Sequence, residues 1–185
     1  MGSTNEMRSV TGSSLSYSAE LLFQLVKRRP GIHIREAQRR TGLGLGNTVY
    51  QLQKLSSLGL IDSNKVGKYK RYYPINIGAY DRSILSALLI PSRRRILLFL
   101  LANKRSTLPE LASNLRLSKS TIIWHIKILQ TSGIITTKST EETFEFRLTD
   151  PKAVSTVLSR FRPSTIDRLS EGFLKSWELL DLGMD

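Results

Sequence analysis

Apolar and polar positions alternate along this chain with the period of amphipathic helices, and the pattern occurs twice. Each copy predicts three helices, over residues 19–29, 34–40 and 46–58 in the first and over 91–103, 108–116 and 118–132 in the second. The third helix of each copy carries the clearest apolar stripe, whose members lie within about 60° of one another on a helical wheel. These stripes, which we expect to face a core, are Thr48, Leu52 and Leu55 in the first copy and Ile122, Ile126 and Leu129 in the second.

The two copies are related by a constant offset of 74 positions without a gap, which pairs Glu36 with Glu110 and Gly59 with Gly133. A glycine follows each third helix, where a left-handed backbone conformation can end the helix. Two β-rich runs come next, over 60–66 and 69–75 in the first copy and over 134–139 and 143–149 in the second. Three helices closed by a β-hairpin are the plan of a winged helix-turn-helix domain.

We therefore expect a mainly α chain with small β-hairpin wings, an α+β fold of two tandem winged helix-turn-helix domains plus C-terminal helices. The expected boundaries are a disordered N-terminal tail over 1–16, the first domain over 17–78, a helical connector over 79–90, the second domain over 91–150 and C-terminal helices over 151–185. The connector carries Ile84, Leu85 and Leu88 at helical spacing, so we expect it to pack against a neighbour.

The last expected helix, after Pro163, carries an apolar stripe that needs a cover. Its members, which step by three or four positions, are Ile166, Leu169, Phe173, Trp177 and Leu180. Either the second domain of the same chain or the same helix of another subunit can supply the cover, because a periodic stripe does not identify its partner. The second alternative makes this helix a candidate dimerisation surface and the chain a candidate homodimer.

Charge points to the class of partner, because the basic residues are concentrated in the two repeats. The chain of 185 residues has 28 Lys and Arg against 15 Asp and Glu, a formal net charge of +13. Residues 16–80 hold eleven basic against three acidic side chains and residues 91–132 hold eight against one, whereas residues 133–185 hold seven against nine. A generic soluble surface mixes both signs. We therefore expect a polyanion as partner, and double-stranded DNA fits a basic winged helix best.

Other chemistries find little support in the sequence. The chain has no cysteine, which excludes disulfides and thiolate metal sites, and its two histidines, His33 and His125, do not make up a zinc site. Because no catalytic motif is present, we expect no enzyme activity, no cofactor and no small-molecule substrate. No apolar run reaches the roughly 18 residues of a membrane span, and we expect a cytoplasmic protein at the nucleoid.

In the first copy, the face of the third helix opposite its apolar stripe is polar. We expect Asn47 and Gln53 to make bidentate contacts with adenine and Lys54 to contact guanine or a phosphate, with Tyr50 between them. A basic wing and a basic second helix accompany this face, so all three segments point to one ligand. Their candidate phosphate contacts are Lys65, Lys68, Lys70 and Arg71 in the wing and Arg35, Arg39 and Arg40 in the second helix.

In the second copy, the same repeat positions give a weaker DNA-binding pattern. Its candidate contacts are Ser118, Lys119, Ser120, Trp124 and Lys127. Trp124 occupies the outward position of Tyr50 and can instead be buried against the connector, the last helix or a second subunit. His125 lies at the edge of the apolar stripe, where we expect helix packing or a phosphate contact. The second wing carries Glu141, Glu142 and Glu145, and these carboxylates would repel phosphate.

Taken together, these segments resemble a family of archaeal transcriptional regulators with two tandem winged helix-turn-helix domains, distantly similar to the MarR and ArsR groups. The likeness rests on residues 31–61 with KYKRYYP, on SRRRILLFLL with residues 110–135, and on FRPSTIDRLSEGFLKSW at 161–177. It covers about residues 17 to 180. The resemblance implies a cytoplasmic DNA-binding protein, often dimeric, that binds DNA through the third helix and the wing.

Three function classes follow from these patterns. The first is a sequence-specific transcriptional regulator, favoured by the amide side chains on the first third helix. The second is an architectural, chromatin-type protein with little sequence preference, favoured by two basic modules. The third is a winged-helix protein-interaction module of the transcription machinery, favoured by the apolar surroundings of Trp124.

Overall fold

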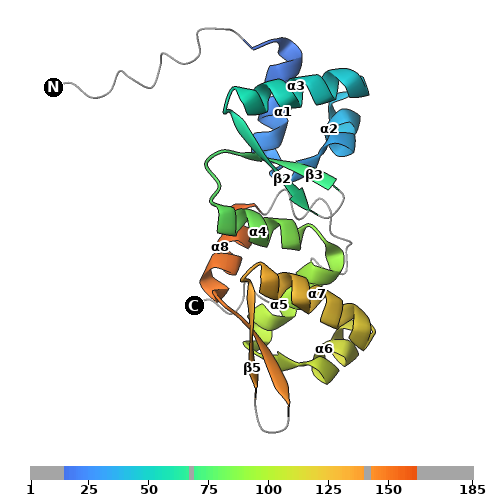
Figure 1. The fold of residues 1–185 in the computed structure, drawn as a ribbon, viewed down its shortest axis with the longest axis vertical. Helices are drawn as coiled ribbons and strands as arrows, with labels where there is room; N and C mark the ends of the chain where they lie inside the picture. Colours follow the sequence, from blue (N-terminus) through green and yellow to red (C-terminus); the bar gives the residue numbers. More distant parts are fainter. Residues whose placement is uncertain (1–14, 67–68, 140–142, 162–185) are drawn as a thin grey trace, which may run out of the picture. The chain divides into compact units, whose positions relative to one another are not determined.

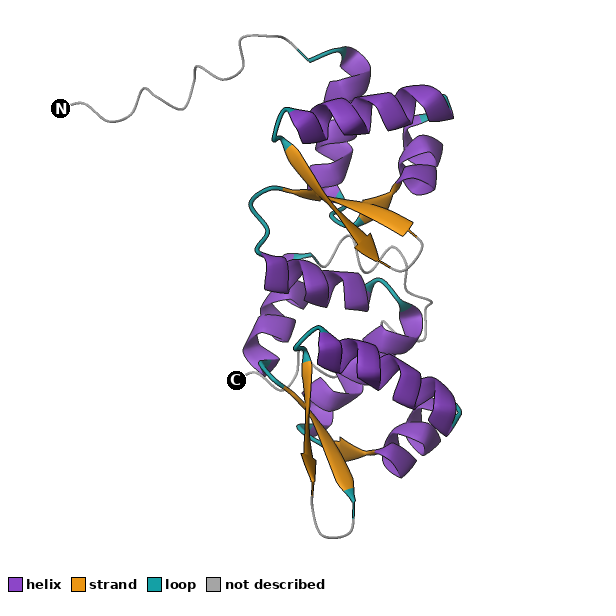
Figure 2. Cartoon of the chain, viewed as in Figure 1, coloured by secondary structure: helices purple, strands orange, loops and turns teal. Residues whose placement is uncertain are grey.

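The chain folds into two compact units, one of residues 1–27 and 32–74 and the other of residues 28–31 and 75–185. The computed structural model describes residues 15–66, 69–139 and 143–161. Helices dominate both units, and each unit contains one small antiparallel sheet (Figure 2). The predicted α+β fold class is therefore confirmed.

The first unit has three helices on one side of a three-stranded sheet (Figure 1). Its elements are α1 (Tyr17–Arg28), β1 (Ile32–His33), α2 (Ile34–Thr41), α3 (Leu45–Ser57), β2 (Ile61–Val66) and β3 (Tyr69–Pro74). β3 is the central strand and pairs antiparallel with β1 and with β2. The core joins Leu22 and Val26 of α1 to Leu52 and Leu55 of α3 and to Tyr72 of β3.

The second unit repeats this arrangement and adds a helix at each end. Its elements are α4 (Ala79–Leu88), α5 (Pro91–Asn103), β4 (Ser106–Thr107), α6 (Leu108–Leu115), α7 (Lys119–Thr131), β5 (Ile135–Ser139), β6 (Phe144–Leu148) and α8 (Pro151–Arg160). β6 is the central strand between β4 and β5. α4 packs against α5 and α8, with Ile84, Leu85 and Leu88 on one side and Val154 and Val157 on the other fully or almost fully buried. The segment expected to act as a connector is thus part of the second core.

The six repeat helices agree with the predicted ranges to within two residues at each end, and all members of both predicted third-helix stripes are buried. Two strands, β1 and β4, are absent from the sequence-based prediction. Each has only two residues, which is too short to show an alternating pattern. The apolar stripe from Ile166 to Leu180 lies outside the described residues, as does most of the expected N-terminal tail.

Gly59 ends α3 in a conformation that other residues adopt only with strain. Its φ is +67°, and the backbone N–H of Leu60 closes the turn by donating to Leu55 O at 3.0 Å. Gly46 is the second residue of α3, where an added Cβ meets no atom within 4 Å. We expect Gly59→Ala to lower the free energy of unfolding by about 1–2 kcal/mol. The matched change Gly46→Ala is expected to raise it by about 0.5–1 kcal/mol. Urea denaturation measures both, and a Gly59→Ala variant that is as stable as the unchanged chain would contradict the left-handed turn.

Candidate nucleic-acid interface

One face of α3 is exposed and polar, whereas the opposite face is buried. Asn47, Gln53 and Lys54 are exposed, and Tyr50 keeps 60% of its surface accessible. The helical period produces this division, because the fully buried stripe that starts at Thr48 lies on the other side. The four side chains predicted to contact DNA from the third helix therefore share one accessible surface.

The two amide side chains on this face differ in how far they are already engaged. The Asn47 side-chain N–H donates to Ser18 Oγ at 3.4 Å, and its oxygen accepts from Gln51 Nε2 at 3.2 Å. Gln53 makes no hydrogen bond with any residue that the structure describes. Gln53 thus offers its complete donor and acceptor set to a ligand, whereas Asn47 offers one N–H and one lone pair. Ser18, in the first turn of α1, was not predicted as a partner of Asn47, because the two residues lie 29 positions apart in the sequence.

The first wing presents two lysines directly opposite each other. Lys65 on β2 is the register partner of Lys70 on β3, and both side chains are exposed. Like charges at paired positions destabilise a sheet. A bound polyanion would relieve this repulsion, so the pair is an expected feature of a phosphate-binding wing. Lys68, also predicted to contact phosphate, lies outside the described residues.

Arg71 does not share this surface, which corrects its assignment as a phosphate contact. It follows Lys70 on the central strand, and successive side chains of a strand point to opposite faces. Only 8% of Arg71 is exposed. The residue belongs to the packed interior of the first unit and is removed from the candidate interface.

The arginines of α2 also fall into two groups. Arg35 and Arg39 are exposed and lie four positions apart, on one side of the helix. Arg40 instead pairs with Glu36, with 3.1 Å between Nε and Oε1, and the Glu36 side chain is 6% exposed. Arg35 and Arg39 are therefore the stronger candidates for phosphate contact.

In the second unit, the predicted contacts on α7 are accessible. Lys119, Ser120 and Lys127 are exposed, and so is Ser118, which caps the helix by accepting from the Thr121 backbone N–H at 3.2 Å. Trp124 is 58% exposed, so it is not buried against the connector helix α4. His125 is buried instead, and this burial, together with the nearby positive charge of Arg93, holds its pKa below the usual range. An imidazole in this position is neutral at pH 7.

Part of the positive charge of the second unit is buried or engaged by neighbouring groups of the same unit. Arg94 is buried and donates to Leu88 O at 3.1 Å, and Arg95 donates to Leu115 O. Arg105 pairs with Glu145 at 3.0 Å. Counting basic residues in the sequence therefore overstates the positive surface of this unit, whereas the first unit keeps Lys54, both wing lysines and two α2 arginines exposed.

The second wing is less repulsive to phosphate than its glutamates suggest. Glu145 lies on β6 between two arginines, with Arg147 at 2.7 Å and Arg105 at 3.0 Å. The hydrogen bond from Arg147, and then the charges of both arginines, lower the pKa of Glu145. Glu141 and Glu142 lie outside the described residues.

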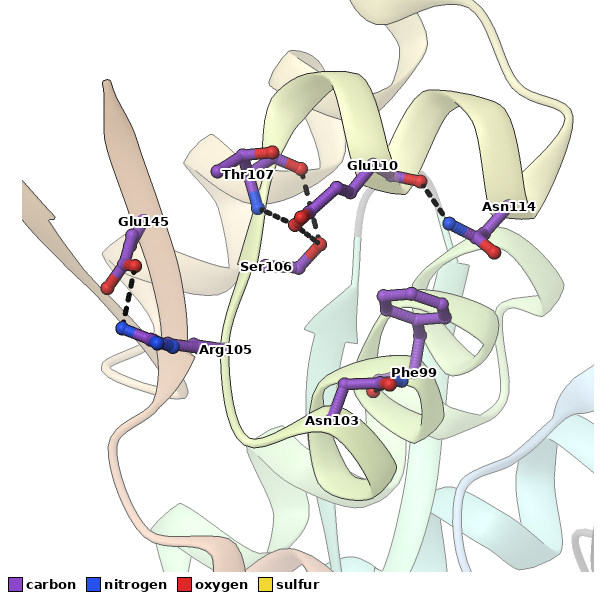
Figure 3. Close-up of a pocket in the computed structure, with 8 residues that line it drawn as sticks. All are labelled: Phe99, Asn103, Arg105, Ser106, Thr107, Glu110, Asn114 and Glu145. Carbon is purple, nitrogen blue, oxygen red and sulfur yellow. Dashed lines mark hydrogen bonds and ion pairs between the residues drawn. The ribbon is translucent and has the colours of Figure 1, made fainter. Parts of the chain in front are cut away.

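A polar cleft of about 440 Å³ lies beside the start of α6, where Glu110 forms a capping box with Thr107 (Figure 3). Glu110 Oε2 accepts from the Thr107 backbone N–H at 2.8 Å and from Ser106 Oγ at 3.0 Å, and these bonds lower the Glu110 pKa. The Arg105–Glu145 pair forms another wall. The polar groups of this cleft thus satisfy one another and hold β4, α6 and β6 in place.

In the described part of the chain, no group of three or more His, Cys, Asp or Glu side chains could hold a metal ion. No helix within those residues has the length and apolar character needed to cross a membrane.

Comparison with known domains matches both halves of the chain. Residues 19–85 match the model of an N-terminal HTH domain, and residues 91–136 match a model described as winged helix-turn-helix DNA-binding. Both models describe helix-turn-helix domains and not an enzyme. The second match begins at Pro91, the first residue of α5, and ends in β5.

The chain is also similar in sequence to one curated relative and to several solved structures. An HTH-type transcriptional regulator of Methanocaldococcus jannaschii is 28% identical over 121 residues, 65% of this chain, but this match spans only 30% of the relative's length. HlyU from Vibrio cholerae is 26% identical, with coverage of 45% of this chain and 90% of HlyU and a TM-score of 0.40. The transcriptional repressor BigR from Xylella fastidiosa is 24% identical, with coverage of 43% and 81% and a TM-score of 0.39.

Proposed function

We propose that this chain, which carries two tandem helix-turn-helix domains, is a transcriptional regulator that binds double-stranded DNA mainly through its first unit. In this proposal α3 enters the major groove and the β2–β3 wing contacts the sugar-phosphate backbone. Such a protein acts on DNA in the cytoplasm.

The surface that carries this proposal joins base-reading groups to unpaired positive charge. Gln53 offers an amide on α3 that is available for a base edge. Lys65 and Lys70 face each other across the wing, and a bound anion would reduce the repulsion between their positive charges. Arg35 and Arg39 on α2 add further exposed charge. Phosphate contacts fix orientation and amide contacts to base edges supply sequence preference, so this surface has both parts of a DNA-reading site.

A genomic selection tests the function directly. The purified chain is incubated with fragmented genomic DNA at near-physiological salt, and the retained fragments are sequenced. A few sharp peaks with a common motif are expected for a transcriptional regulator. Even coverage would support the architectural alternative, which the high net charge favours, and no retention would contradict DNA binding.

Two single substitutions separate base reading from phosphate binding. Gln53→Ala is expected to reduce discrimination at one base position of the selected motif by about 1–3 kcal/mol. Lys70→Ala is expected to weaken binding to all DNA sequences equally. It is also expected to lower the slope of log K against log salt by about 1. Anisotropy titrations with a motif duplex and single-base variants measure both effects. If Gln53→Ala weakens every duplex equally, α3 does not read bases through this residue.

The second unit and the end of the chain supply finer parts of the proposal. Lys119 and Lys127 are available for a further phosphate contact. The sequence stripe from Ile166 to Leu180 supports a homodimer through the C-terminal helix. A palindromic selected motif and a dimer mass in light scattering are expected, and a monomer mass with a single half-site would contradict the dimer.

A further inference from the structure

The start of α5 in the second unit concentrates positive charge. The helix begins at Pro91 and has Arg93, Arg94 and Arg95 in its first two turns, with no acidic residue in the first turn and no side-chain cap. Within the described residues, the backbone N–H groups of Ser92 and Arg93 have no acceptor. A helix N-terminus carries partial positive charge. Three cations at this end therefore repel the helix dipole and one another.

Arg93 is the unsatisfied member of this group. Arg94 and Arg95 donate to backbone carbonyls, but Arg93 makes no hydrogen bond or ion pair with any described residue. It is only 9% exposed, and its Nε is fully buried without a partner, whereas its two terminal nitrogens are not fully buried. A nearly buried cation without a counter-charge is costly. Among the described residues, the guanidinium has no anionic partner, and its terminal nitrogens are not fully buried.

Two aromatic side chains of α7 complete the cluster. The Arg93 guanidinium carbon lies 5.7 Å from the ring centroid of Trp124, whose ring in turn lies 4.7 Å from that of His125. His125 is 6% exposed, and its Nδ1 is buried without a hydrogen-bond partner. Trp124 is 58% exposed, which places the cluster at the surface of α7.

The first unit has no counterpart of this cluster. The repeat places Ala19 at the position of Arg93 and Gln51 at the position of His125. Ala19 is fully buried in the first core. The unpaired cation is thus a property of the second unit alone and not a requirement of the shared fold.

We propose that Arg93, His125 and the free N–H groups at the start of α5 form a binding site for a phosphate group, which the DNA backbone supplies. A guanidinium edge binds two oxygens of a phosphate at once, and backbone N–H groups at a helix start bind the same group. The neutral imidazole of His125 adds one N–H donor. Trp124 lies at the outward position of α7, where we expect the backbone of a bound duplex to pass. The DNA source, but not the phosphate site itself, rests on the proposed function.

Inorganic phosphate is the first probe, and Trp124 fluorescence is the readout. The full chain contains two tryptophans, so Trp177→Phe provides a background in which only Trp124 reports. Phosphate is titrated against chloride at constant ionic strength. A saturable change in fluorescence is expected in this background. It is expected to disappear in Arg93→Met, whose unbranched side chain replaces a buried cation without leaving a large cavity.

Two further variants are needed in case Arg93→Met folds poorly, or in case phosphate binding depends only on the positive charge of residue 93. Arg93→Lys keeps the charge but loses the planar fork, and we expect about tenfold weaker phosphate binding. Lys104→Gln removes one charge at the other end of α5, about 16 Å from Arg93 along the helix. It is expected to leave the phosphate response unchanged, and circular dichroism confirms that each variant is folded.

Duplex DNA is the second probe, and the salt dependence of binding is the readout. One lost phosphate contact lowers the slope of log K against log salt by about 0.9. We expect this decrease for Arg93→Met and no decrease for Lys104→Gln.

The combined outcomes separate the site from its source of phosphate. If Arg93→Met loses the fluorescence response to phosphate but keeps the salt dependence of DNA binding, the site binds a free phosphate compound and not the DNA backbone. No phosphate response in the background protein would overturn the site, even if DNA binds. A phosphate response without any DNA binding would overturn the proposed function and leave the site intact.

Discussion

Replacing Lys65 and Lys70 together by glutamine is expected to weaken duplex DNA binding roughly 60-fold at 0.1 M salt. Each phosphate contact contributes about 0.9 to the slope of log K against log salt, which corresponds to roughly eightfold in affinity at this concentration. The two lysines face each other across the wing and are both exposed, so we expect both contacts to be lost. Anisotropy titrations between 0.05 and 0.3 M salt, roughly the range over which such slopes are measured, should give a slope lower by about 2.

A control pair with the same change in net charge distinguishes a local contact from a general charge effect. Lys104 and Lys152 are exposed in the second unit, and neither belongs to the candidate interface. Their double glutamine variant is expected to keep most of the affinity. If both double variants lose affinity equally, the wing has no special role. Removing the facing lysines should also leave the first unit at least as stable, because a repulsive cross-strand pair is gone.

The largest effect on stability is expected for Leu52→Ala, which should lower the free energy of unfolding by about 2–5 kcal/mol. Leu52 is fully buried in the core cluster that also contains residues of α1 and β3, so truncation removes apolar contacts and leaves a cavity. Leu58, at the end of the same helix, is 47% exposed, and Leu58→Ala is expected to change the free energy of unfolding by less than about 0.5 kcal/mol. Urea denaturation followed by circular dichroism measures both variants.

Similar losses for both leucines would contradict the inward orientation of the α3 stripe and, with it, the outward orientation of Tyr50 and Gln53. The two faces of α3 are fixed by one helical rotation. The stability measurement therefore also tests the surface proposed to read DNA, without any DNA in the experiment.

The elements that the sequence predicted well are those whose signals are local and repeated. Pro91 and Asn103 mark the predicted and observed ends of α5, because a proline is tolerated at a helix start and the apolar run ends there. Gly59 and Gly133 both take a positive φ after the third helices. The strands β1 and β4 were missed because their identity depends on pairing with β3 and β6 and not on their own two residues.

The candidate site was predictable only where helical rotation decides exposure. The accessible face of α3 followed from the position of its apolar stripe. The burial of Arg71 depends on strand register and on the order of strands in the sheet, and neither can be predicted from the sequence pattern. The burial of the α5 arginines depends on tertiary contacts. A run of three basic residues suggests a charged surface, yet Arg93 and Arg94 are buried in the second unit.

The opposite charges of Arg71 and Glu145, at equivalent positions of the two repeats, affect which strands pair while a protein with tandem domains folds. Arg71 on β3 and Glu145 on β6 are equivalent central-strand positions, and Glu145 accepts from Arg105 just before its partner strand β4. The residue equivalent to Arg105 before β1 is Gly31. Tandem repeats can misassemble during synthesis when a strand of one copy pairs with the other. If β6 paired with β1, Glu145 would lose this arginine, so divergence at these two repeat positions favours each strand's own partner and discourages misfolded, copy-swapped chains.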